Sequence, residues 1–228
     1  MLHSFFVGIL VDGRKPSARP RTRPARSRKL AAIVALLLGV SPLVRGQDIA
    51  APQRRINARI DDAQRTVLLG QRHPMATSSS DTGRVSGGEP MIAMAMHLKP
   101  TAKQSADVEE LLAEQLDPKS INFHRWITAA QFGDRFGADS EDLAKITAWL
   151  VSKGFAVSPA THSQIWIDFN GSTGQAETAF RTEIHRYQAS DRTFYANASD
   201  PSVPAAFADM VGTIDGLDNY IEQRPDLN

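Results

Sequence analysis

Hydrophobic and polar positions follow regular patterns from residue 91 onward. The apolar run at 91–98, which ends at a Lys-Pro pair, is typical of a buried strand. Apolar residues spaced three and four apart then predict an amphipathic helix over 101–116. Acidic and cap-type residues introduce a second amphipathic stretch over 139–153, and Gly154 is the expected stop of that helix.

The pattern continues with strands arranged around a third helix. Strands are predicted at 155–158, 164–169 and 183–187, and the third helix is predicted at 173–181. Shorter elements are expected at 194–196 and 205–210. The order is strand, helix, inserted helix, strand, strand, helix, strand. We therefore expect an α+β domain with a ferredoxin-like split β-α-β fold: an antiparallel sheet, helices packed on one face, and an inserted loop and helix.

The long connection between the first two helices, residues 119–138, contains Trp126, Phe132 and Phe136. Loops of this length inside a compact domain usually have a function. Large aromatic side chains, however, are usually well buried. Two interpretations therefore remain open: these aromatic residues pack the insertion onto the sheet, or they form a binding surface.

The segment before the regular pattern has a different composition. Residues 47–90 are polar and irregular, and they contain Ser- and Gly-rich stretches that are typical of a flexible linker. The folded domain is therefore expected to span 91–220, with a C-terminal tail at 221–228.

Residues 1–46 have the pattern of a secretory signal peptide. They contain nine basic residues and one acidic residue, and the apolar run 30–40 directly follows the basic stretch. That run is too short for a stable membrane anchor, which needs about 20 residues. We predict cleavage between Gly46 and Gln47, with export to the extracellular space or the periplasm. A basic stretch can also bind nucleic acid, but no such partner is expected, because that interpretation leaves the apolar run without a role.

The charge balance changes once this leader is set aside. The whole chain has 26 Lys and Arg against 25 Asp and Glu, whereas residues 47–228 contain 17 basic and 24 acidic residues. The predicted mature chain is therefore acidic. The chain has no cysteine, which excludes disulfides, a thiol nucleophile and cysteine-ligated metal sites.

No catalytic constellation is apparent in the sequence. The six histidines include no metal-type pair with a three-residue gap. Ser172 lies in a Gly-Ser-Thr-Gly stretch between a predicted strand and a predicted helix, where an N-cap is favoured over a nucleophile. No glycine-rich phosphate-binding loop occurs, so no cofactor or metal is expected.

Four blocks of sequence occur in a fixed order between residues 90 and 220. They lie at 111–118 with 123–128, 131–133 and 136–137; at 146–150 with 154–157; at 179–187 with 195–197 and 201–204; and at 211–220. Together they resemble the activation propeptide, of the pro-kumamolisin type, of the sedolisin/kumamolisin serine-carboxyl peptidases. One departure is Ala129, where the family usually has Pro, and it predicts a softer start to the short helix that follows.

The resemblance implies a ferredoxin-like propeptide that assists the folding of a secreted peptidase, covers its active-site cleft and is removed in acid. The partner it implies is the catalytic domain of a sedolisin-type peptidase. The family's catalytic Glu, Asp and Ser and its calcium site are expected in a downstream domain that this chain lacks. We therefore expect no enzymatic activity, cofactor or metal in this chain.

Two surfaces are candidates for contact with the peptidase. The first is the aromatic loop, with His124, Trp126 and Phe132. The second is the segment from Leu217 onward, which the resemblance places near the cleft and whose deletion is expected to impair inhibition more than folding. Its named residues are Leu217, Asp218, Asn219 and Tyr220. Acid would protonate carboxylates that pair with the peptidase, and His124 and His185 could add a step near pH 6.

Other functions remain open from the sequence. The domain could be a free-standing secreted inhibitor of a separate peptidase, or, less favoured, an active serine-type peptidase. The DNA that follows the codon for Asn228 would separate a peptidase precursor from a stand-alone inhibitor.

Overall fold

The computed structural model describes residues 52–189 and 192–220. The predicted signal peptide and its cleavage position between Gly46 and Gln47 lie outside the described residues. The predicted tail at 221–228 lies outside them as well.

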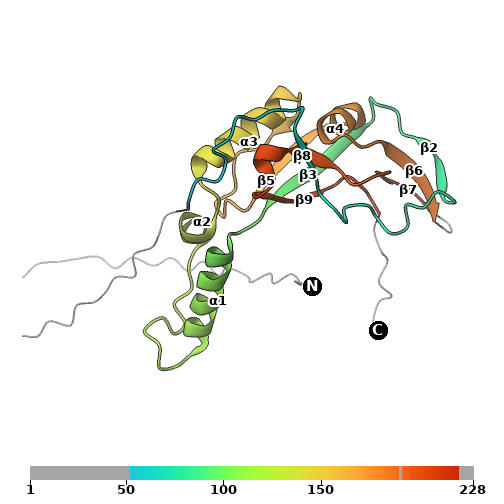
Figure 1. Ribbon diagram of the computed structural model, residues 1–228. Coiled ribbons are helices and arrows are strands. Elements are labelled where there is room, and N and C mark those ends of the chain that lie inside the picture. Colours follow the sequence, from blue (N-terminus) through green and yellow to red (C-terminus); the bar gives the residue numbers. More distant parts are fainter. Residues whose placement is uncertain (1–51, 190–191, 221–228) are drawn as a thin grey trace, which may run out of the picture. The chain divides into compact units, whose positions relative to one another are not determined.

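A four-stranded antiparallel sheet forms the centre of the domain (Figure 1). Its strands lie in the order β4, β5, β3, β9, and every neighbouring pair is antiparallel. Their bounds are Ala156–Val157 for β4, Trp166–Ser172 for β5, Pro90–Leu98 for β3 and Val211–Asp215 for β9. The central position of β3, between β5 and the last strand, agrees with the expected ferredoxin-like fold class.

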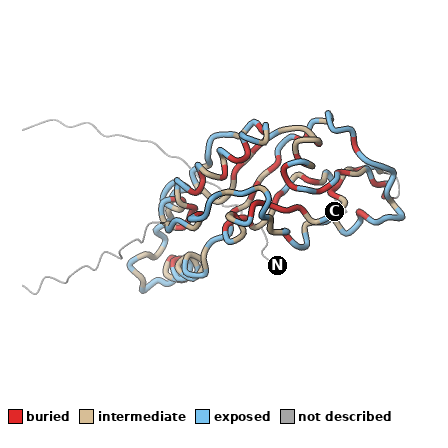
Figure 2. Tube along the Cα trace, turned by 45° about the horizontal axis from the view of Figure 1, so that its top comes forward, coloured by how far each residue is buried: buried red, intermediate tan, exposed pale blue. Residues whose placement is uncertain are grey.

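Helices cover only one face of this sheet. The helices are α1 (Ala102–Leu116), α2 (Ala129–Phe136), α3 (Ser140–Ser152) and α4 (Thr173–Phe180). The ribbon shows α3 and α4 above the sheet, whereas α1 and α2 form the insertion that leads from β3 to α3 (Figure 1). Buried residues gather where α3 and α4 meet the strands (Figure 2).

Aromatic side chains join these two layers in the core. The Phe155 ring lies 5.0 Å from the Phe169 ring, edge to face, and stacks at 5.7 Å on Phe180. The Trp149 ring meets Phe207 at 5.5 Å, again edge to face. Such pairs contribute about 0.5–1.5 kcal/mol beyond the area they bury. They therefore fix α3 and α4 on the sheet and not merely near it.

The helices begin at side chains that the sequence makes recognisable. Thr101, Thr128 and Ser172 each accept a hydrogen bond from a backbone N–H three residues on, and a glutamine at that position bonds back in each case. The N-cap interpretation of Ser172 is therefore confirmed. The capping box on Thr128 also gives α2 a defined start, so Ala129 does not leave its first turn without support.

A second sheet has the order β2, β6, β7. The bounds are Asp81–Arg84 for β2, Ile184–Ala189 for β6 and Arg192–Asn197 for β7. Tyr187 and Phe194 stack at 5.5 Å within a small separate core. A two-stranded ladder pairs β1 (Arg65–Val67) with β8 (Ser202–Pro204), and the short helix η1 (Ala205–Phe207) follows it.

The fourth strand of the main sheet differs from the sequence-based expectation. The strand at 183–187 was expected to complete it, but this segment is β6 of the second sheet, and β9 takes the place beside β3. The register of β9 shifts between His97 and Leu98, so that its buried residues, Val211 and Ile214, lie three apart. A strand with a bulge shows no simple alternation, which is why the pattern did not reveal it.

The linker predicted for 47–90 is also corrected over its described part. Residues 52–90 contain β1 and β2, and Ile56, Leu68 and Val85 are buried in the main core. Polar side chains lie outside while single apolar residues point inward, so the average composition resembles that of a linker. The folded domain therefore begins well before residue 91.

A buried carboxylate holds the start of this segment against α3. Asp142 is fully buried and accepts the backbone N–H groups of Arg55, at 2.6 Å, and Ile56, at 3.2 Å. Lys145 Nζ donates to the Ile56 carbonyl at 2.6 Å. These contacts join residues almost 90 positions apart, and they satisfy backbone groups that are removed from water.

No helix in the described part of the chain is both long enough and apolar enough to span a membrane.

We expect Asp142→Ala to lower the free energy of unfolding by about 2–4 kcal/mol, because it leaves two buried N–H groups unpaired. Glu141→Ala is the matched control, since the neighbouring Glu141 is exposed and pairs only with Arg54 on the surface. Its cost should stay below about 1 kcal/mol. Urea unfolding of the two variants measures the difference, and equal costs would contradict the role assigned to Asp142.

Candidate peptidase interface

The loop after α1 folds back onto the last turns of that helix. Gln115 is buried, and its Nε2 donates to the Arg125 carbonyl at 2.5 Å. The His124 N–H donates in turn to the Gln115 carbonyl at 3.0 Å. Asn122 Nδ2 donates to the Glu114 carboxylate at 2.6 Å. The loop therefore has a fixed shape, although it is far from the sheet in sequence.

This fixed loop exposes a group of large apolar side chains. Trp126 is 64% exposed, and Leu112, Leu116 and Ile121 are exposed as well. The His124 ring stacks against Phe123 at 3.8 Å and lies nearly parallel to Trp126 at 6.1 Å. We call Leu112, Leu116, Ile121 and Trp126 the α1 apolar surface. Clustered exposed apolar residues of this size mark interaction sites more often than isolated ones.

The two interpretations of the aromatic loop can now be separated. Trp126 does not pack onto the sheet, because the loop turns back along α1 instead. Phe132 is half-buried on α2 and lies 5.2 Å from the buried Phe136. Trp126 is therefore available for contact, whereas Phe132 mainly packs α2.

The segment 217–220 belongs to the folded domain. Leu217 is only 2% exposed and is part of the main core, which corrects the expectation that it faces a partner. Asn219 is hydrogen-bonded twice to Tyr195: its Oδ1 accepts the Tyr195 N–H at 2.7 Å, and its own N–H donates to the Tyr195 carbonyl at 3.1 Å. Asp218 Oδ1 accepts the Tyr220 N–H at 3.1 Å.

The ring of Tyr220 completes this attachment. It meets Phe194 edge to face at 4.9 Å and lies 4.5 Å from the His73 ring. A deletion that starts at residue 217 would remove a core side chain and the contacts that hold β7. Loss of inhibition in such a deletion would therefore not distinguish binding from folding.

A further surface was not singled out from the sequence. Alternate residues of the main sheet point away from α3 and α4, and none of them is buried. We call this surface the open sheet face; its residues are Ala95, His97, Trp166, Asp168, Thr213 and Asp215. The alternation of β5 could have revealed it, because Trp166 and Asp168 occupy the positions between the buried Ile167 and Phe169.

Polar contacts organise the open sheet face. His97 Nε2 lies 3.0 Å from Asp215 Oδ2, and Trp166 Nε1 donates to Asp168 Oδ2 at 3.1 Å. The hydrogen bond to Asp215 raises the pKa of His97, against the opposing effect of partial burial. The same hydrogen bond lowers the pKa of Asp215. The pair is therefore favoured in its charged form.

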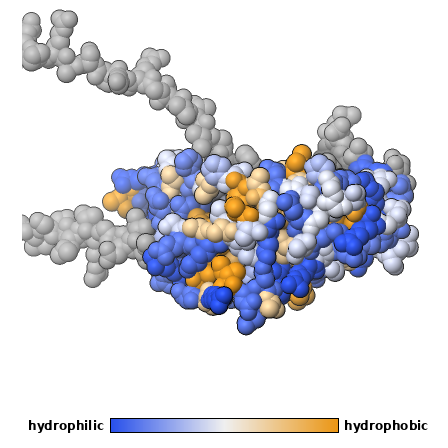
Figure 3. Space-filling model, turned by 90° about the horizontal axis from the view of Figure 1, so that it is seen from above, coloured by the Kyte–Doolittle hydropathy of each residue, from blue (hydrophilic) through white to orange (hydrophobic). Residues whose placement is uncertain are grey.

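The other side of the domain has a different character. Viewed from the side of α3 and α4, the surface is mostly hydrophilic, and hydrophobic residues form small separated groups (Figure 3). Val151 of α3 is one exposed apolar residue outside the α1 apolar surface, at 55% exposure.

His185 lies in the second sheet, away from both surfaces. Its Nδ1 is 2.7 Å from Asp81 and its Nε2 is 3.1 Å from Glu183. Burial lowers the tendency of His185 to charge, but hydrogen bonds to the two carboxylates outweigh it and raise its pKa. The carboxylate partners of His185 are therefore inside the domain itself.

Surface hollows provide no catalytic arrangement. The larger one, of about 680 Å³, lies between α2, α3 and the loop at 157–162, and it contains hydroxyl groups and His162. Within residues 52–189 and 192–220, no hydroxyl is hydrogen-bonded to His162, so a nucleophile–base pair is not formed. The same residues contain no group of three or more His, Asp or Glu side chains placed to hold a metal ion.

Comparison with known proteins places this domain. The family model described as "Pro-kumamolisin, activation domain" matches residues 77–220, more than half of the chain. Xanthomonalisin of Xanthomonas sp. (strain T-22) is 28% identical over 204 residues, which cover 84% of this chain and 25% of that relative. Sedolisin of Pseudomonas sp. (strain 101) is 26% identical over 125 residues, covering 55% and 21%.

Kumamolisin of Bacillus sp. (strain MN-32) is 23% identical over 165 residues, covering 72% of this chain and 29% of that relative. The chain thus spans about a quarter of the length of the curated relatives it matches. The family match begins inside the segment that the sequence pattern had assigned to a linker, in agreement with the folded β2. The chain belongs to the pro-kumamolisin activation domain family.

Proposed function

We propose that this domain is the propeptide of a sedolisin-type serine peptidase, which it inhibits by covering the active-site cleft and whose folding it assists. The observation that carries the proposal is the family match over 77–220, together with relatives of which this chain spans only about a quarter. An activation domain acts on a catalytic domain, so the partner is the peptidase itself. The predicted signal peptide at 1–46 adds export to this proposal.

The role requires no catalytic residue of this chain. We infer that the catalytic Glu, Asp and Ser, and the calcium site, belong to the partner domain. What the propeptide must supply is a folded surface complementary to the peptidase. Two exposed surfaces, on opposite types of element, are suited to this task.

The α1 apolar surface is the first contact region. Apolar side chains exposed on a domain cost free energy unless a partner covers them, and Trp residues are frequent hot spots of interfaces. The hydrogen bonds from Gln115 and His124 hold the loop in shape before binding. Preorganisation of this kind reduces the entropy lost on association.

The open sheet face is the second contact region. It combines Trp166 with the charged pair of His97 and Asp215, and its centre is the small residue Ala95. Ala95 pairs with Asp168 on one side and Asp215 on the other. A sheet face with a small centre and polar surroundings can approach a partner closely while its charges fix the orientation.

The direct test is inhibition of a purified sedolisin-type peptidase by the full chain. We expect near-stoichiometric inhibition near neutral pH and no hydrolysis of casein by the chain alone at pH 4. Absence of inhibition for every family member tested would overturn the proposal, and casein turnover by the chain would favour an enzyme.

We expect Trp126→Ala to weaken inhibition by about tenfold or more, as truncation of a hot-spot residue does. The melting temperature should stay nearly unchanged, because the side chain is largely exposed. Val151→Ala is the control, since it truncates an exposed apolar residue outside the α1 apolar surface, and it should alter neither quantity. A lower melting temperature with unchanged inhibition would show that Trp126 stabilises the fold instead.

Ala95→Arg tests the open sheet face. Cross-strand side chains lie about 5 Å apart, so an arginine at this position can pair with Asp168 or Asp215 and the sheet should still form. The long side chain would nevertheless stand between the sheet and a partner. We expect inhibition to fall by about a hundredfold, the effect of losing an interface centre. Ala148→Arg, on the exposed side of α3, is the matched control. Equal inhibition by both variants would exclude the open sheet face from the interface.

A further inference from the structure

The edge strand β2 differs from every strand of the main sheet in how it is held. All four of its residues, Asp81–Arg84, are exposed. The nearest buried apolar residues are Ala76 before it and Val85 after it. The intervening stretch therefore contributes no apolar side chain to either core, and its attachment depends on hydrogen bonds and charges.

The backbone ladder between β2 and β6 is short and irregular. Val85 N–H donates to the Ile184 carbonyl and Gln188 N–H donates to the Ser80 carbonyl, both at 2.8 Å. Between these bonds the register shifts at Gly83, whose φ of +118° is favourable only for glycine. The ladder alone is therefore a weak attachment for an exposed strand.

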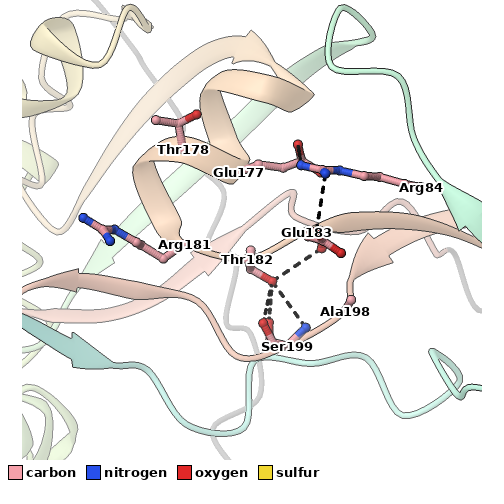
Figure 4. A pocket seen from close by; sticks show the side chains of 8 residues that line it. All are labelled: Arg84, Glu177, Thr178, Arg181, Thr182, Glu183, Ala198 and Ser199. Atoms are coloured by element: carbon pink, nitrogen blue, oxygen red, sulfur yellow. Dashed lines mark hydrogen bonds and ion pairs between the residues drawn. The ribbon is translucent and has the colours of Figure 1, made fainter.

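Ion pairs add most of the remaining contacts. Arg84 forms two bonds with the Glu177 carboxylate of α4, at 3.0 and 2.8 Å, and lies 3.4 Å from Glu183 (Figure 4). His185 of β6 bridges Asp81 and Glu183, and Arg186 pairs with Glu89. The Arg72 charge also faces Asp81. A hollow of about 480 Å³, lined by Arg84 and Glu177 among others, keeps this side open to solvent (Figure 4).

The cluster contains equal numbers of opposite charges when all groups are ionised. Its cations are Arg72, Arg84, Arg186 and protonated His185, and its carboxylates are Asp81, Glu89, Glu177 and Glu183. Protonation of the carboxylates removes every ion pair and leaves four positive charges beside one another. Acid therefore both abolishes attraction and introduces repulsion at this edge.

We propose that β2 is an acid-released strand: below about pH 4 it separates from β6 while the four-stranded sheet remains folded. The apolar core of the main sheet has no carboxylate in contact with Met94, Met96 or Phe169 that could respond in the same way. Release exposes residues 77–84 to cleavage and frees the edge of β6. Its role as the first step in removing the propeptide rests on the proposed function, whereas the release itself does not.

The signs of the individual groups define the pH window. A backbone hydrogen bond from Gly83 and the bond to His185 lower the pKa of Asp81 below 3.8. Burial opposes ionisation of Glu177, but the bonds from Arg84 and the Ile184 N–H outweigh it and lower its pKa below 4.5. These two carboxylates stabilise the attachment above those ordinary values, and the contribution is lost as pH falls through their lowered pKa values.

His185 acts in the opposite direction. Its pKa is raised above 6.5, so its contribution is complete below that value and is lost as pH rises through the raised pKa. The attachment of β2 is therefore strongest between about pH 4.5 and 6.5. It weakens moderately in alkali, where only the His185 pairs are lost, and strongly in acid, where every pair is lost.

Amide hydrogen exchange on the full chain without any peptidase tests the release. Rates at pH 5.5 and pH 3, corrected for intrinsic exchange, are compared between the β2–β6 ladder and the β3–β5 ladder. We expect protection of the Val85 and Gln188 amides to fall at least about tenfold more than that of the β3–β5 amides, because local opening precedes global unfolding. An equal loss in both ladders, or retained protection at Val85 and Gln188, would overturn the proposal.

Two sets of variants separate charge from other effects of acid. The triple variant Asp81→Asn, Glu177→Gln, Glu183→Gln should open β2 already at pH 5.5, whereas Glu109→Gln, Glu110→Gln, Asp134→Asn removes as many carboxylates elsewhere and should not. Arg84→Gln with Arg186→Gln removes half of the positive charge, so acid should release this strand less than in the native chain. Unchanged acid release in that double variant would overturn the charge mechanism. Inhibition assays are not involved, so the proposed function is tested independently.

Discussion

The main sheet buries Met94, Met96, Ile167 and Phe169 beneath α3 and α4, and the same strands leave their alternate side chains uncovered. Because side chains along a strand alternate between faces, covering one face with helices necessarily produces an open one. The stability of the domain comes from the helix side, where the aromatic rings meet. The opposite side is free of that task, and its residues can be selected for contact with a partner.

The N-terminal segment depends on this same helix layer. Asp142 projects from α3 and holds the backbone at Arg55 and Ile56, and farther along Asp62 accepts a hydrogen bond from Trp149 Nε1 at 2.9 Å. A chain segment of polar composition thereby becomes part of the core structure without a long apolar run. Its order is supplied by polar groups on α3, which must themselves be placed by the packing of Trp149 and Leu150.

The sequence predicts those features that depend on neighbouring residues. The capping residues Thr101 and Ser172, the apolar spacing of α3 and the stop at Gly154 are all local, and all are found in the structure. Features that depend on distant partners were missed or misassigned. Residues 52–68 are ordered by α3, the strand β9 contains a bulge, and β2 has no buried side chain, so none of the three has a local signature.

The candidate surfaces follow the same division. The aromatic loop was identified from composition, but only its fold-back onto Gln115 shows that Trp126 is exposed and that Phe132 is not equally so. The alternation of β5 contained the open sheet face, yet the partner of His97 comes from β9, a strand that the pattern did not predict. Leu217 appeared to belong to a tail because its contacts in the core are with residues far earlier in the chain.

The position of β9 also constrains the order of folding. Ala95 and Asp215 are paired although they lie 120 positions apart, so the central strand β3 keeps one unpaired edge until almost the whole domain is present. Contacts of such long sequence separation slow folding, and an unpaired strand edge favours association between chains. A newly exported chain therefore passes through a stage in which β3 and β5 are paired but the sheet is unfinished. Rapid docking of β9 onto β3 is what ends the exposure of that edge.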